Sequence, residues 1–136
     1  MEEYWKYIIV SIVILALDAI WIFTNFKMYS QSVRAVQKSD LSVNTVAAFA
    51  AYAVVLFASL YVAIPFTKNY VRSGDTASEK LWKAFAYGGA VGFSVYAIYN
   101  FTSAAIYKNY EWSVALIDTV WGTVLNTLVV FIYLMM

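Results

Sequence analysis

The sequence predicts an all-α integral membrane protein: a four-helix transmembrane bundle with both termini on the same side. Composition and charge distribution both support this fold class. Of the 136 residues, 63% are hydrophobic and only 12% are charged, which lies outside the usual mix of soluble globular domains. Apart from Asp18 and Asp118, the charged residues lie at or near the ends of long apolar stretches. This distribution is typical of polytopic helical membrane proteins.

Four apolar stretches are each long enough to cross a hydrocarbon core of about 30 Å, which takes roughly 20 helical residues. They cover residues 4–26, 43–66, 81–107 and 112–135. Strands of a membrane barrel would instead show shorter runs that alternate in polarity. We therefore expect one four-span domain over residues 1–136, in a membrane that the sequence does not identify.

Local signals at the ends of these stretches predict how each helix begins and ends. Glu2 and Glu3 precede the first stretch in place of a basic region, which indicates a retained span and not a secretion signal. Pro65 is expected to end the second helix, and Ser78 is a candidate N-cap for the third. Five basic residues flank the stretches on the side of the termini and four on the other, so the positive-inside rule leaves orientation open.

The third stretch carries a stripe of small residues, Ala84, Gly88 and Gly92, at four-residue spacing. Such a stripe lets a neighbouring helix backbone approach closely. We expect it to pack against another helix of the same chain, and a homo-oligomer contact through the same stripe is the alternative.

Composition also limits the chemistry of the protein. The net charge of +1 gives no basic field for nucleic acid. The chain has no cysteine and no histidine, and these are the commonest ligands of zinc, haem and iron–sulfur clusters. No lysine lies deep in a stretch where it could form a Schiff base. We therefore expect no cofactor and no metal site, and the lipid bilayer as the main partner.

Polar residues gather at one level of the predicted bundle. At about 1.5 Å per residue, Asp18 lies roughly 13 Å, Asp118 roughly 9 Å and Asn100 roughly 10 Å from the surface opposite the termini, and Tyr52 falls at a similar depth. The spacing Asp18-Ala-Ile-Trp21 is repeated in Asp118-Thr-Val-Trp121. An intramembrane charge costs about 2.5–3.5 kcal/mol, so it normally faces a partner or a water-filled cavity.

We therefore predict a binding or transport site made of Asp18, Trp21, Tyr52, Tyr96, Tyr99, Asn100, Thr102, Ser103, Asp118 and Trp121. If the two aspartates approach closely, both can be ionised only with a compensating cation or a network of donors. The alternative is structural, with each aspartate tying helices together through hydrogen bonds. Tyr29 and Arg34, in the first connection, are interpreted as ordinary interface residues.

At these residues the chain resembles a family of small, predicted four-span membrane proteins known as a domain of unknown function, found in bacteria and some large DNA viruses. The resemblance covers nearly the full length. It rests on Leu17-Asp18-Ala19-Ile20-Trp21, Tyr29, Pro65, Gly89, Gly92, Tyr96, Tyr99 and Asp118-Thr119-Val120-Trp121-Gly122-Thr123-Val124-Leu125. Where the family typically has Y-D-x-T-N, this chain has Tyr99-Asn100-Phe101-Thr102-Ser103. Asn100 replaces a carboxylate, which makes a tight divalent-cation site less favourable here.

Three functions fit these residues. The first is a carrier or channel for a proton, a monovalent cation or a small cationic solute, using Asp18, Asp118 and their aromatic neighbours. The second is a membrane-embedded enzyme or binding protein for a lipid or isoprenoid, with an aspartate as general acid or base. The third is a structural or scaffolding protein in which the polar layer fixes helix register.

Overall fold

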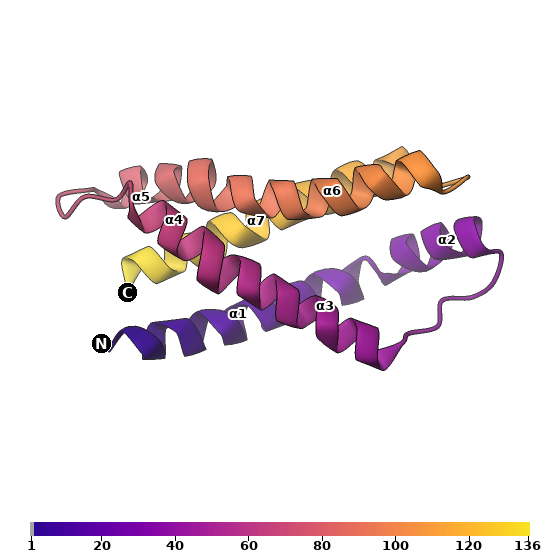
Figure 1. The fold of residues 1–136 in the computed structure, drawn as a ribbon, viewed down its shortest axis with the longest axis horizontal. Coiled ribbons are helices and arrows are strands. Elements are labelled where there is room, and N and C mark those ends of the chain that lie inside the picture. The colour runs from indigo at the N-terminus through magenta and orange to yellow at the C-terminus, as the bar shows by residue number, and fades with distance from the viewer. Residues whose placement is uncertain (1) are drawn as a thin grey trace.

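The computed structural model describes residues 2–136, and all regular structure in that range is helical, which confirms the all-α prediction (Figure 1). Two of the segments, η1 and η2, are π-helical. In chain order the elements are α1 (Glu3–Thr24), α2 (Phe26–Gln37), α3 (Thr45–Phe57), η1 (Ala58–Ala63), α4 (Ile64–Lys68), α5 (Ala77–Lys83), η2 (Ala84–Gly89), α6 (Ala90–Ile106) and α7 (Trp112–Met135). The α3, η1 and α4 segments form one continuous helix, and α5, η2 and α6 form the next.

Three of these helices are long and apolar enough to cross a membrane, namely Glu3–Thr24, Thr45–Lys68 and Trp112–Met135. The third predicted span falls in the α5–η2–α6 helix, which is not among them. Glycines, tyrosines and Asn100 make that helix less apolar than its neighbours. Both termini and the α4–α5 connection lie at one end of the bundle, here called the termini end, while α2 lies near the opposite end (Figure 1).

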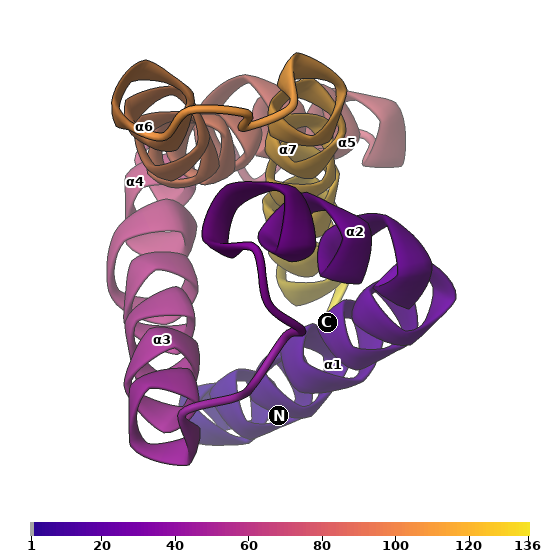
Figure 2. The ribbon, with the colours of Figure 1, turned by 90° about the vertical axis from the view of Figure 1, so that its right-hand side faces the viewer.

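The helix α2 was not foreseen from the sequence, which placed residues 27–42 in a connection. It follows α1 after a single intervening residue, Asn25. Its backbone packs against α1 and α7, and Figure 2 shows it lying across the end of the bundle opposite the termini. The first connection therefore closes one end of the bundle.

Pro65 does not end the second long helix, contrary to the prediction, because the helix continues to Lys68. Proline lacks an amide hydrogen, and its ring collides with the carbonyl four residues earlier in a regular α-helix. Here the six residues before α4 form the π-helical segment η1, whose wider turn uses bonds between residues five apart. The widened turn leaves room for Pro65 within the helix.

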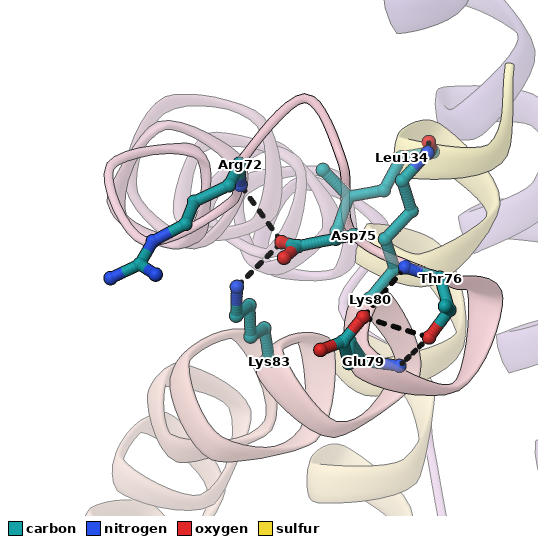
Figure 3. A network of polar contacts seen from close by, with 7 residues as sticks. All are labelled: Arg72, Asp75, Thr76, Glu79, Lys80, Lys83 and Leu134. Carbon is teal, nitrogen blue, oxygen red and sulfur yellow. Dashed lines mark hydrogen bonds and ion pairs between the residues drawn. The ribbon is translucent and has the colours of Figure 1, made fainter.

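Thr76, and not the predicted Ser78, is the N-cap of α5 (Figure 3). The Thr76 hydroxyl accepts a hydrogen bond from the Glu79 amide at 3.2 Å, and the Glu79 carboxylate accepts one from the Thr76 amide at 2.8 Å. This reciprocal pair is a capping box, whose sequence pattern is T-x-x-E. Ser78 lacks a glutamate or glutamine three residues later and lies inside the helix.

The hydrophobic core occupies the half of the bundle nearer the termini. Its members come from α1, η1, α4, η2 and α7, and they are Val10, Ile14, Ala63, Ile64, Ala84, Leu125, Val129, Val130 and Tyr133. The small-residue stripe packs here against α7 of the same chain. A Cβ added at Gly92 would lie 2.1 Å from the Gly122 carbonyl oxygen, and one at Gly88 would lie 2.7 Å from the Val130 side chain.

Candidate functional site

A cavity of about 740 Å³ occupies the other half of the bundle, between α1, α2, α3, α6 and α7. The polar and aromatic side chains on its wall are Asp18, Trp21, Tyr29, Ser32, Tyr52, Tyr96, Tyr99, Tyr110 and Asp118. The remaining wall is made of alanine, valine and isoleucine side chains, and neither lysine nor arginine lines it. The cavity therefore combines two acidic groups with an aromatic and aliphatic surface.

Asp118, on α7, has a hydrogen-bond donor at each carboxylate oxygen. The Tyr29 hydroxyl of α2 donates to Oδ1 at 2.5 Å, and the Asn100 amide of α6 donates to Oδ2 at 2.6 Å. A carboxylate accepts hydrogen bonds at both of its oxygens, and both oxygens of Asp118 have a donor here. Three elements, α2, α6 and α7, meet at this one side chain, and α2 is distant in sequence from the other two.

Tyr29 links Asp118 to α1, because its hydroxyl oxygen accepts a hydrogen bond from the Trp21 indole nitrogen at 2.8 Å. The Tyr29 hydroxyl thus acts both as a hydrogen-bond donor, to Asp118, and as an acceptor, from Trp21. This chain of contacts also fixes α2 against the bundle, since the side chain reaches from α2 to partners on α1 and α7.

Asp18, on α1, is 7% exposed and accepts a hydrogen bond from the Trp121 indole nitrogen at 2.9 Å. The rings of Trp21 and Trp121 stack with centroids 4.5 Å apart and planes inclined by 2°. Residues three apart share a helix face, so each D-x-x-W motif places its aspartate and tryptophan together. Because α1 and α7 run in opposite directions (Figure 1), the stacked indoles bring the two acidic residues into one cavity.

Asn100 is fully buried, and all of its polar atoms are used. Its amide nitrogen donates to Asp118 and to the Tyr96 carbonyl oxygen, the latter at 2.9 Å, and its oxygen accepts from the Tyr110 hydroxyl at 2.7 Å. Burial, Tyr99 and Asp118 raise the pKa of Tyr110 to about 12, so its hydroxyl stays protonated and able to donate at neutral pH. Asn100 thus holds the Asp118 carboxylate in position.

The structure brings most of the predicted site residues together. Six of them line the cavity: Asp18, Trp21, Tyr52, Tyr96, Tyr99 and Asp118. Asn100 and Trp121 lie behind the wall and bind the two carboxylates. Thr102 and Ser103 do not reach the cavity, because Thr102 is exposed on the outer surface of α6 and Ser103 is buried elsewhere.

Two residues of the network, Tyr29 and Tyr110, are absent from the predicted site. The interpretation of Tyr29 as an ordinary interface residue is wrong, because α2 folds back and carries its hydroxyl to Asp118. The one sequence signal for it was its place among the residues on which the family resemblance rests. Tyr110 lies in the connection before α7, and no spacing rule indicates its contact with Asn100. Arg34 is exposed and lies 3.4 Å from Asp40.

Long apolar helices with two acidic side chains among aromatic ones define a multi-pass helical membrane protein with an internal polar site. The chain belongs to the family described as "Predicted membrane protein (DUF2177)", which it matches over residues 4–135. This match confirms the resemblance and the membrane location. No curated protein and no solved structure matches the chain. The family description names no activity.

Proposed function

We propose that the chain crosses the membrane four times, with the α5–η2–α6 helix as the third span and both termini on one side. Residues 77–106 form one continuous helix, and at about 1.5 Å per residue it is longer than the 30 Å hydrocarbon core. Its exposed Trp82 and the Tyr107 that follows it suit the two interfaces. The small-residue stripe is already packed against α7 of the same chain, which favours packing within the chain over a homo-oligomer contact through the stripe.

We further propose that the protein is a small carrier for a cationic organic solute, bound between Asp18 and Asp118. The observation that carries this proposal is one cavity that contains both acidic side chains and no basic one. Uncompensated carboxylates in a membrane interior are costly, and a cationic guest offsets that cost. The aromatic wall adds faces that attract cations.

The size of the cavity favours an organic cation over a proton or a bare monovalent ion. A volume of about 740 Å³ lies within the roughly 300–1,000 Å³ range of small-molecule sites. A channel for protons or metal ions has no need of so large an apolar wall. Asp118 accepts a hydrogen bond at each carboxylate oxygen, whereas Asp18 accepts one from Trp121 and has the Tyr52 hydroxyl beside it.

Binding and flux of a lipophilic cation test this function. We expect tetraphenylphosphonium to bind the purified protein and to cross liposomes containing it, with Asp18→Asn and Asp118→Asn each weakening binding about tenfold, the equivalent of roughly 1.4 kcal/mol. The matched control is Asp40→Asn, which changes an exposed aspartate at the same end. Proton and monovalent-cation fluxes are measured in the same liposomes.

The carrier proposal fails if Asp118→Asn leaves every measured ion and solute flux unchanged. A loss of thermal stability in both cavity variants without any binding or flux in the wild type would instead favour a structural role. Circular dichroism and thermal melts of each variant separate these outcomes from simple misfolding.

A second candidate, a binding protein or enzyme for a lipid or isoprenoid, is favoured by the wall that α3 contributes. That wall is mainly small and apolar, with Ala48, Ala51, Val54 and Val55, and α3 has no buried residue of its own. An apolar chain could lie against it. Mass spectrometry of the purified protein would support this candidate if a lipid were retained, and altered by the wild type but not by Asp18→Asn.

A further inference from the structure

A second pocket, of about 320 Å³, lies at the termini end, far from the carboxylate cavity. It is formed where α1 begins, where α4 ends and where α7 ends, together with the α4–α5 connection and Lys80 of α5. Its wall consists of Glu3, Lys6, Lys68, Val71, Arg72, Ser73, Lys80, Tyr133 and Leu134. The two pockets are opposite in character, because this one is dominated by basic side chains.

The four cations of this pocket face a single carboxylate on its wall. Glu3 accepts hydrogen bonds from the Lys68 ammonium and the Tyr133 hydroxyl, so its charge is matched by Lys68. The Lys6 ammonium lies over the face of the Tyr133 ring, with its nitrogen 5.6 Å from the ring centroid, and it forms no ion pair with any residue from 2 to 136. Three basic side chains, Lys6, Arg72 and Lys80, therefore lack an acidic partner within the pocket.

Two acidic residues near the pocket, Asp75 and Glu79, are engaged elsewhere (Figure 3). Asp75 accepts a hydrogen bond from Lys83 at 2.5 Å and one from the Arg72 amide at 2.8 Å. The Lys83 ammonium lowers the pKa of Asp75, with the Arg72 amide adding to the effect. Glu79 is held by both the amide and the hydroxyl of Thr76 in the capping box. Neither carboxylate is directed to the unpaired cations.

Arg72 and Lys80 keep donors available for a ligand. The Arg72 guanidinium makes no ion pair or hydrogen bond to any residue from 2 to 136, and Figure 3 shows it directed away from the Asp75 carboxylate. Lys80 donates to the Leu134 carbonyl oxygen at 3.1 Å, and an ammonium has three donors. The hydroxyls of Ser73 and Tyr133 add further polar groups to the wall.

We propose that this pocket binds a phosphate group, carried by the headgroup of an anionic phospholipid or by a small soluble phosphate. Clustered cations repel each other, and a phosphate accepts strong charge-assisted hydrogen bonds from both arginine and lysine. Basic pockets between the ends of membrane helices suit anionic lipid headgroups, because the ends of spans lie at headgroup depth. The site is independent of the proposed carrier function.

The lipid arm of the test compares nanodiscs of phosphatidylcholine alone with nanodiscs that also contain phosphatidylglycerol. Native mass spectrometry measures the phosphatidylglycerol retained on the protein. We expect Arg72→Gln/Lys80→Gln to weaken this binding at least tenfold, because the substitutions remove two cationic donors that can bind a phosphate. The matched control is Lys27→Gln/Lys108→Gln, with the same loss of charge at exposed positions of the other end.

The soluble arm measures the shift in melting temperature of detergent-purified protein with inorganic phosphate, against sodium chloride at the same ionic strength. A shift that the pocket variant loses and the control variant keeps supports a soluble phosphate. Preferential retention of phosphatidylglycerol, lost in the same way, supports a phospholipid. Arg72→Gln alone breaks no side-chain hydrogen bond or ion pair within residues 2–136 and serves where the double variant does not fold. Equal behaviour of pocket and control variants in both arms overturns the proposal.

Discussion

In each of the two D-x-x-W motifs, the carboxylate is bound to the indole of the other motif, either directly or through Tyr29, so the contacts run between α1 and α7. Trp121 binds Asp18 directly, and Trp21 reaches Asp118 through the Tyr29 hydroxyl. The repeated spacing in the sequence indicated that the motifs belong together, because a buried charge requires a partner. It could not indicate Tyr29, whose role depends on the direction that the chain takes after Asn25.

Among the glycines, Gly92 has the shortest distance from an added Cβ to a neighbouring atom. The structure leaves a Cβ at this position only 2.1 Å from the Gly122 carbonyl oxygen, which belongs to backbone and cannot turn aside. We expect Gly92→Ala to force α6 and α7 apart and to lower stability by about 3 kcal/mol. Thermal unfolding in detergent measures the change.

Gly74→Ala is the control for this substitution. No atom lies within 4 Å of a Cβ at Gly74, and its φ is not positive. We therefore expect its melting temperature to stay close to that of the wild type. Equal effects of the two substitutions would contradict close packing of α6 on α7.

At the level of elements, the α3–η1–α4 helix and the α5–η2–α6 helix each contain a π-helical segment. The two segments contact each other in the half of the bundle that contains the hydrophobic core. The η1 segment carries Ser59, whose hydroxyl donates to Asn126 on α7 at 3.0 Å. Hydrophobic periodicity cannot distinguish a π-helical turn from an α-helical one over six residues. The sequence therefore predicted the helices and missed both segments.

The capping box at the start of α5 gives a prediction for a single element. We expect Thr76→Ala to lower stability by about 1 kcal/mol, because the Glu79 amide loses its acceptor and the reciprocal arrangement is broken. Ser78→Ala, two residues later, removes a hydroxyl without a capping role and should have little effect. Chemical or thermal unfolding compares the two, and a larger loss for Ser78→Ala would place the cap where the sequence first suggested it.

For the whole molecule, the bundle divides into a packed half near the termini and a hollow half that contains the acidic cavity. In lipid, helices associate mainly through van der Waals packing and hydrogen bonds. The packed half therefore supplies most of the cohesion, while the hollow half relies on the network around Asp18 and Asp118. A site that leaves a large volume unfilled is supported by dense packing elsewhere.

Two leucines of α7 test this division. Leu125 is fully buried in the core, and Leu116 is 53% exposed on the same helix. We expect Leu125→Ala to lower stability by about 2–4 kcal/mol through the void it leaves, and Leu116→Ala to change it little. Melting curves in one detergent compare the pair. Similar losses would mean that cohesion is spread evenly along the bundle.

The sequence by itself determined the class of protein, the apolar helices and the two acidic residues of the site. Apolar length and the cost of buried charge are properties that composition and spacing carry directly. Only the tertiary structure decided that α2 folds back, that Tyr29 and Tyr110 complete the network, and that Thr102 faces outward. Those outcomes depend on which way a short connection turns and on how helices rotate about their axes, and both are set by packing between segments far apart in the chain.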